Sequence, residues 1–454
     1  MKKIVILSLL SISAFSAESY DNLLDGGIID AQLRYFYMQR DYDKLAKDER
    51  GDYTQHDRYK KSSSALGGHL GFVTKPFYGL TAGVTFYTSQ PLFRNPPDQG
   101  GLQLLEDDQS GFTVLGEANI AWHYDHTLLK IGRQRLSDYR FLSDMDIRMV
   151  PYTYEAAVAE NRSFEDITIR AAAVRGVKKL VSSDYVDFIT ASDNLLIEPK
   201  KGPGPLRGDY RKSYFQPGTG YIGPRENLYL ASFVYDDKHR SLEVWDYYLP
   251  NFVNFIYMEA SAMMDMGDFR HRLSLQGIRQ KDIDEHWAGT IDTWELGIKY
   301  QLSYKSWNLS YAHSQVKYDE NSLDGGTIID SWGNNLIYNS YYYNGGDEGG
   351  TVADGIVLSY QFPIRDLTAE AILAKVDIPN GPTELFVDQD NHEYDLVLSY
   401  RPAWNRHLEF KAVGIYVDFD TDYDFRLYES IHDYPFSRTY NSILDTRFIV
   451  NYTF

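Results

Sequence analysis

DTRFIVNYTF, residues 445–454, closes the chain and decides its fold. Counted back from the last residue, apolar and polar side chains alternate, with Ile449 as the exception. The apolar positions are Phe448, Val450, Tyr452 and Phe454. A period of two predicts a β-strand with one apolar face and one polar face. The solvent that meets the apolar face then decides what kind of protein this is.

The opposite end of the chain predicts export. Met1-Lys2-Lys3 is a positive start, residues 4–12 are a short apolar core, and Ala14-Phe15-Ser16 supplies small residues for cleavage after Ser16 or Ala17. This pattern predicts a signal peptide over residues 1–17 and one mature domain over residues 18–454. The core is too short to span a bilayer as a helix.

Composition narrows the class of protein further. The chain has 454 residues, a formal charge of −19 and no cysteine, so its stability in an oxidising compartment cannot depend on disulfides. No window holds about 18 uninterrupted apolar residues, which excludes helical membrane spans. The negative charge argues against nucleic acid as a partner. A composition averaged over the whole chain would not reveal a membrane-facing surface built from alternating strands, because half of the side chains of each strand point to water.

The period of two recurs along the mature chain, while no sustained period of 3.6 and no linker are found. Clear examples are residues 31–40, 78–87, 294–302, 394–401 and 407–414. We count about 18 strands, the weakest being residues 184–193. Short connections fall at 75–76, 125–126, 237–239, 267–268, 304–306, 363–365 and 403–405. Long ones fall at 41–61, 89–110, 136–162, 195–226, 317–350, 377–391 and 420–438.

Short turns at one end and long loops at the other are typical of an outer-membrane barrel. Aromatic residues beside the short turns fit an interfacial girdle. The sequence therefore predicts an all-β, transmembrane antiparallel β-barrel of a Gram-negative outer membrane, with short periplasmic turns and long extracellular loops. Its partners would be membrane lipid, lipopolysaccharide and, through the terminal Phe454, the barrel-assembly machinery, with the barrel a monomer or a trimer.

If the apolar face meets lipid, the polar face lines a channel. Its predicted pore-lining cations are Arg34, Arg40, Lys130, Arg270, Arg272, Lys299, Arg401, Lys411 and Arg447. Carboxylates gather instead in the loops, at residues 319–350 and 418–433, while the loop at 195–226 is basic. A basic interior would favour anionic solutes. Pairing with acids on neighbouring strands is the alternative, and the basic loop could be a vestibule over the mouth or a surface loop.

The segment at 130–174 interleaves apolar and aromatic residues with charges, as expected for a loop folded into the barrel and packed on its wall. Its GRQ (132–134) and DIRMVPYTYEAA (146–157) resemble the constriction-loop region of the OprD-like outer-membrane porins. LRYFYMQRDY (33–42) resembles the first strand of that family, and LEVWDYYL (242–249) is a weaker match. The resemblance implies 18 strands and a narrow, selective channel for small solutes, often carboxylates. The positions that match its constriction motif are Asp146, Arg148, Pro151, Tyr154 and Glu155.

The chemistry of these residues supports such roles. Arg148 offers a planar fork for a carboxylate, and Pro151 stiffens the turn. Asp146 and Glu155 can hold the loop or place opposite charge across the pore. Ala156 stands where the family has glycine, and the loops are unusually acidic, so passage of cations or zwitterions stays open beside that of carboxylates.

A diffusion channel for small hydrophilic solutes is the first functional hypothesis. A structural or adhesive barrel whose acidic loops bind divalent cations is the second, although DFDTDYD (418–424) lacks the Gly and final Glu of a Ca²⁺ loop. A barrel-embedded hydrolase is the third, but His123, His271 and His313 are scattered and no serine-centred motif accompanies them. We therefore predict no catalytic residue, no metal ligand and no cofactor.

Overall fold

The computed structural model describes residues 26–47, 53–93, 100–192, 215–216, 220–221, 224–287, 289–319, 321–329, 332–343, 345–363, 366–378, 390–420 and 440–454. The predicted signal peptide, most of the basic loop and most of the acidic stretch at 418–433 lie outside these residues. No helix within the described part is long and apolar enough to cross a membrane.

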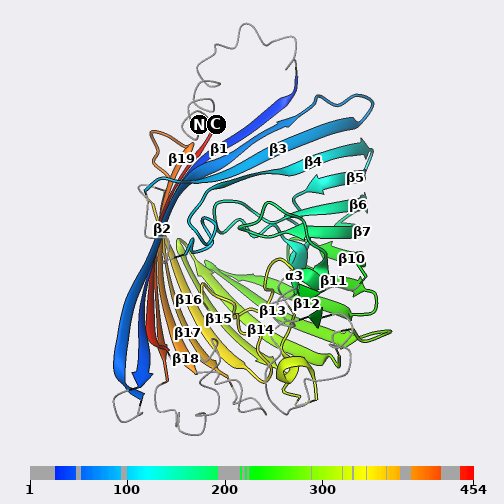
Figure 1. Ribbon diagram of the computed structural model, residues 1–454. Helices are drawn as coiled ribbons and strands as arrows, with labels where there is room; N and C mark the ends of the chain where they lie inside the picture. Colours follow the sequence, from blue (N-terminus) through cyan, green and yellow to red (C-terminus); the bar gives the residue numbers. More distant parts are fainter. Residues whose placement is uncertain are drawn as a thin grey trace.

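Within the described residues, eighteen strands form one antiparallel sheet that closes on itself (Figure 1). The first nine are β1 (Ile28–Lys47), β2 (Tyr53–Val73), β3 (Leu80–Pro91), β4 (Phe112–Tyr124), β5 (Thr127–Gln134), β6 (Thr153–Phe164), β7 (Ile167–Lys178), β10 (Leu228–Asp236) and β11 (Arg240–Leu249). The others are β12 (Val253–Met266), β13 (Phe269–Asp282), β14 (Asp292–Tyr304), β15 (Trp307–Val316), β16 (Val352–Phe362), β17 (Leu367–Asp377), β18 (Asn391–Tyr400), β19 (Leu408–Phe419) and β20 (Tyr440–Thr453). The predicted fold class and strand number are confirmed.

The barrel closes between its first and last strands. β1 pairs with both β2 and β20, with Tyr35 opposite Val450 and Leu33 opposite Tyr452. The backbone N–H of Phe454 donates to the carbonyl oxygen of Ala31 at 2.9 Å. Closure leaves no free edge at this seam, so the backbone groups of the terminal strands are paired within the wall.

Alternation along each strand separates an apolar exterior from a polar interior. On β14, Leu296 is 58% exposed and Ile298 and Tyr300 are also exposed, although all three are apolar or aromatic. Their neighbours Lys299 and Gln301 line an internal cavity. A large apolar exterior is what a lipid-facing barrel requires, so the closing strand's apolar face, with Phe448 exposed, meets lipid.

A charge placed on this exterior should destabilise the barrel, and one placed inside should not. We expect Leu296→Arg to cost roughly 2–4 kcal/mol of folding free energy, because the guanidinium would sit in hydrocarbon. Gln301→Arg, on the same strand but facing the cavity, is the matched control. Urea titration in lipid vesicles, followed by the mobility of unboiled protein on gels, measures both. Equal stability of the two variants would contradict the assigned faces.

Three local expectations were wrong, one of them the long connection predicted over residues 136–162, of which residues 153–162 belong to β6. The long loop predicted over residues 41–61 is mostly strand, since β1 and β2 stay in register as far as Lys47 and Tyr53, and Tyr42 stacks on Tyr59 at 4.8 Å. Figure 1 shows this blue hairpin running past the end of β3. The weakest predicted strand, 184–193, is not part of the wall. Its described residues form one bridge to β7 and the short helix α3 (Phe188–Ala191), which contacts the inner side of β7.

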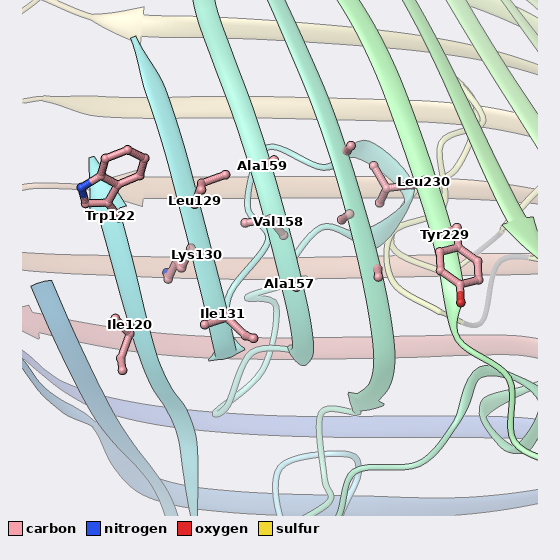
Figure 2. A pocket seen from close by; sticks show the side chains of 13 residues that line it. Ile120, Trp122, Leu129, Lys130, Ile131, Ala157, Val158, Ala159, Tyr229 and Leu230 are labelled. Carbon is pink, nitrogen blue, oxygen red and sulfur yellow. The ribbon is translucent and has the colours of Figure 1, made fainter. Parts of the chain in front are cut away.

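A shallow groove of about 630 Å³ lies on the outer face, over β5, β6, β7 and β10 (Figure 2). The small side chains Ala157, Ala159, Ala171 and Ala173 form its floor, while Ile131 and Tyr229 rise on either side. Ile131 and Ala157 are exposed on the lipid-facing side. The groove is therefore a depression in the outer surface and takes no part in a path through the lumen.

Candidate functional site

The segment that joins β5 to β6 runs inside the barrel, as predicted; we call residues 135–152 the constriction loop (Figure 1). It contains the single 3₁₀ turn η3 (Arg140–Leu142), whose Phe141 and Leu142 are buried. Phe141 packs edge-on against Phe255 of β12, with ring centroids 4.4 Å apart. These contacts explain why apolar residues interrupt the charges of this loop, since one side of it packs on the wall.

A second loop also lies in the lumen, and the sequence analysis placed it wrongly among acidic outer loops. This second lumen loop comprises residues 321–329 and 332–343, and includes η4 (Leu323–Gly326). Its buried residues include Ile328, Ile329, Trp332 and Ile337. The same interleaving of apolar and acidic residues that located the constriction loop was present here and could have located this loop too.

Buried amide side chains hold the second lumen loop to the wall. Gln280 of β13 accepts a hydrogen bond from the backbone N–H of Ile329 and donates one to its carbonyl oxygen, both at 2.8 Å. Gln276, four residues earlier on the same face of β13, donates to the carbonyl of Leu336 at 2.5 Å and accepts from the N–H of Tyr338 at 3.2 Å. Each amide donates one hydrogen bond to the loop backbone and accepts one from it, as a neighbouring strand would. These buried backbone groups of the loop are therefore satisfied.

Trp332 joins the two loops to the segment around α3. Its indole N–H donates to the carbonyl of Phe188 at 3.0 Å and to the hydroxyl of Ser192 at 2.6 Å. The hydroxyl of Tyr154 donates to the carbonyls of Trp332 and Ser143, each at 3.0 Å. Tyr154, a predicted constriction residue, is therefore a fully buried anchor at the start of β6, where it cannot contact a solute.

An internal cavity of about 950 Å³ lies in the half of the lumen next to the short turns. The constriction loop (Met145 to Arg148) and the second lumen loop (Asn334 to Tyr342) cover it. Much of the wall is neutral and polar: Gln32, Gln301, Ser303, Asn308, Ser310, Ser359, Ser399 and Asn451. Such a lining suits a hydrated solute path whose selectivity depends on the few charged groups among the lining residues.

Arg34 of β1 holds the tip of the constriction loop. Its guanidinium contacts both carboxylate oxygens of Asp146, at 2.6 and 3.1 Å, and donates to the carbonyl of Arg148. Burial alone would raise the pKa of Asp146, but the hydrogen bonds and charge of Arg34 lower it. Asp146 is therefore an ionised partner of Arg34, and these two charges cancel.

Arg148 is a buried cation at the cover of the cavity. Arg148 is among the residues that line the cavity, it is only 4% exposed, and one N–H of its guanidinium donates to the carbonyl of Ile147 at 3.0 Å. Its Nε has no hydrogen-bond partner, and no carboxylate of the described residues forms an ion pair with it. Burial and the nearby Arg447 and Arg40 lower the pKa of Arg148 to about 9, which leaves it charged at neutral pH.

One carboxylate serves the two arginines beside Arg148. Asp445 of β20 is 1% exposed, accepts from Arg40 at 2.7 Å and accepts from Arg447 twice, each time at 3.0 Å. Close by, Lys411 of β19 donates to the hydroxyl of Tyr342 at 3.1 Å and forms no ion pair within the described part of the chain. Two guanidinium groups thus share the carboxylate of Asp445, and the guanidinium of Arg148 beside them has no ion pair among the described residues.

The remaining predicted site residues divide by position. Arg34, Lys299, Lys411 and Arg447 line the cavity, together with Asp146 and Arg148. Pro151 is buried, and Glu155 lies on β6, where it pairs with Arg133 at 3.1 Å. Lys130 takes the inward position between the exposed Leu129 and Ile131 of β5, away from this cavity.

Five of the nine predicted pore-lining cations, Arg40, Lys130, Arg270, Arg272 and Arg401, are not among the residues that line this cavity. Arg270 and Arg272 are exposed near the start of β13, beside a short turn, and Arg270 pairs with Asp265 at 2.9 Å. Arg401 follows β18 and pairs with Glu409 at 2.9 Å. Because their strands begin or end at the short turns, these side chains reach solvent at the short-turn end of the barrel, which we call the mouth. Two acids that were not predicted from the sequence also line the cavity, Glu370 and Glu409.

No family model matches the sequence, and no curated protein matches it either. Among solved structures, OccAB3 of Acinetobacter baumannii superimposes with a TM-score of 0.74 at 15% identity, covering 95% of this chain and 99% of that one. OccK9 (OpdG) of Pseudomonas aeruginosa gives 0.72 at 16% identity, over 95% and 98%. OpdK of P. aeruginosa, solved with vanillate, gives 0.68 at 16% identity, over 95% and 99%.

These neighbours are OprD-like porins, and the chain has their fold over nearly its whole length. The fold and the apolar exterior together indicate an outer-membrane barrel of a Gram-negative bacterium. Contact with outer-membrane lipid follows from that placement.

Proposed function

We propose that this OprD-like barrel is a passive diffusion channel that favours small anionic solutes, carboxylates above all. Arg148 carries the proposal, because a buried guanidinium without an ion pair among the described residues lies against the cavity. A planar guanidinium binds carboxylates through two parallel hydrogen bonds, and the effect is stronger where water is partly excluded.

The balance of charge in the cavity wall supports the same preference. Five cations line it, Arg34, Arg148, Lys299, Lys411 and Arg447, against the carboxylates Asp146, Glu370 and Glu409. Plain electrostatic pairing accounts for Arg34 and Arg447, which are bound to Asp146 and Asp445. The other three cations form no ion pair within the described residues, and carboxylates act on them only from a greater distance, Asp445 on Arg148, Glu370 on Lys299 and Glu409 on Lys411. The wall therefore presents a surplus of positive charge.

The comparisons support the solute class at a coarser level. The neighbours are porins, which are channels and not enzymes. The OpdK structure contains vanillate, an aromatic carboxylate, and we propose that solutes of similar size and charge cross this channel. The neutral amides and hydroxyls of the wall would bind the polar substituents of such a molecule.

Two electrical and transport measurements test the proposal. Purified protein in a planar bilayer under a KCl gradient should give a reversal potential with the sign expected of a channel that is more permeable to chloride than to potassium. Liposomes should swell faster in benzoate than in benzylamine hydrochloride, which match in size and differ in charge. A potassium-selective current would overturn the anion preference. Absence of any current would instead favour a structural barrel.

We also propose that Phe454 marks the chain for barrel assembly, after export directed by residues 1–17. The terminal strand is paired on both sides, and the rings of Phe454 and Tyr452 are in edge contact at 4.9 Å, on the lipid-facing side. Deleting Phe454 should leave the seam's other pairings intact and still lower the amount of folded barrel in the outer membrane severalfold. Gel mobility of unboiled membranes measures this, and folding of the same variant in detergent is the control. Normal membrane levels would contradict the assembly role.

A further inference from the structure

A chain of polar contacts crosses the closing seam and ends at the constriction loop. Arg401 donates to Oε1 of Glu409 at 2.9 and 3.0 Å, and Asn451 donates to Oε2 of the same carboxylate at 3.0 Å. Arg34 donates through Nε to Oδ1 of Asn451 at 2.8 Å and through its other nitrogens to Asp146. The contacts join β18, β19, β20 and β1 in turn, so they follow the seam from the mouth inward.

Arg34 is fully engaged at the end of this chain. Its Nε binds the wall, while its two terminal nitrogens bind Asp146 and the carbonyl of Arg148. Asp146 cancels the charge of Arg34, and Arg34 is buried. A guanidinium in this state has little capacity left for a solute. Arg34 instead holds the loop, by its hydrogen bonds to the side chain of Asp146 and to the backbone carbonyl of Arg148.

The loop tip needs such a support, since its own backbone is strained. Met145 has a φ of 37°, in the left-handed region that non-glycine residues rarely adopt. Conformations of this kind persist only where surrounding contacts hold them. Arg34 of the wall contacts the tip on either side of Ile147, at the carboxylate of Asp146 and at the carbonyl of Arg148.

We propose that Arg34 is the positioning residue of the constriction: it fixes the loop tip to the closing seam and so keeps the Arg148 guanidinium at the cavity. This inference rests on the anion-selective channel proposed above. Arg34 sets selectivity by holding the guanidinium of Arg148 in position. The charge of Arg34 itself contributes almost nothing, because Asp146 neutralises it.

A charge-neutral double substitution separates position from charge. Arg34→Met with Asp146→Asn removes one positive and one negative charge and leaves the net charge of the wall unchanged. If Arg34 acts only by charge, the reversal potential stays that of the wild type. We expect instead that the chloride-to-potassium permeability ratio falls at least halfway to that of Arg148→Ala, and that open-channel current noise rises severalfold as the tip loosens. Arg34→Lys, which keeps the charge but loses the fork, should be intermediate.

The ion pair of Arg270 and Asp265 at the mouth is the matched control. Arg270→Met with Asp265→Asn removes the same two charges far from the loop and should change neither ratio nor noise. Gel mobility of unboiled samples confirms that each variant is a folded barrel. Wild-type ratio and noise in the Arg34 double variant would overturn the inference. If the wild-type channel lacks anion selectivity, the proposed function fails, and the noise of the two double variants still decides whether Arg34 holds the tip.

Discussion

Arg148→Ala is expected to lower the chloride-to-potassium permeability ratio about tenfold. A unit charge about 6 Å from an ion in water contributes about 0.7 kcal/mol, a factor of about three in favour of the anion and about three against the cation. Partial exclusion of water in the covered cavity would make the effect larger. The reversal potential of a planar bilayer under a KCl gradient measures the ratio directly, and single-channel conductance shows whether the pore itself has changed.

Two matched variants make this result specific. Arg148→Lys keeps a cation and should retain most of the ratio while binding carboxylates less well, since an ammonium lacks the planar fork. Arg406→Ala removes a cation that is exposed at the short-turn end and paired with Asp366, neither of which lines the cavity, so it should change the ratio little, because screened surface charges act weakly. An unchanged ratio in Arg148→Ala would remove Arg148 from the ion path.

The wall of the barrel could be predicted from the sequence because its signal is local. A period of two assigns each residue to lipid or lumen without knowledge of its partners, and Arg34, Lys299, Lys411 and Arg447, which it assigns to the lumen, lie along the internal cavity. The closing strand could be recognised for the same reason. The expected loop at 41–61 failed because charged residues suggested solvent, whereas the strands continue wherever both backbones can pair.

The contents of the lumen could not be predicted in the same way. The second lumen loop has no periodicity, and its anchors, Gln276 and Gln280, lie some fifty residues earlier on another strand. The free charge in the cavity depends on which cations are paired. Those pairs join Arg34 to Asp146 and Arg40 to Asp445, far apart in sequence. Only the resemblance in the constriction loop pointed to Arg148, and only the structure shows that it is the arginine left without a carboxylate.

The loops inside the barrel pack into one apolar cluster with inward-facing residues of the wall, and this cluster is distinct from the strand pairing that holds the wall itself. The cluster contains Phe141, Phe188, Phe252 and Trp332, with ring centroids of the first three 5.3–6.4 Å from Trp332. The wall is held by strand pairing around the whole circumference, which does not involve these rings. Loss of the cluster should therefore free the loops while the barrel stays folded.

Trp332→Ala tests this and should have the largest effect on conductance. Truncating a buried aromatic residue costs about 3–5 kcal/mol, and here the loss includes two hydrogen bonds to the α3 segment. We expect the loops to leave the lumen for part of the time. Single-channel conductance should rise roughly twofold or more, with anion selectivity reduced, because locally unfolded loops no longer cover the cavity. Trypsin should cut at Arg135 or Arg140 of the constriction loop, which the packed state protects.

The controls divide the effect between ring and hydrogen bonds. Trp332→Phe keeps an aromatic ring against Phe141 and Phe188 but loses the indole donor, so it should cost only about 1–2 kcal/mol and give a smaller rise in conductance. Trp307→Ala removes an indole that is 46% exposed on the outer face of β15 and should leave conductance and cleavage as in the wild type. If Trp332→Ala keeps both the wild-type conductance and the wild-type resistance to trypsin, the lumen loops are held by the wall through Gln276, Gln280 and Arg34, and the aromatic cluster does not control the constriction.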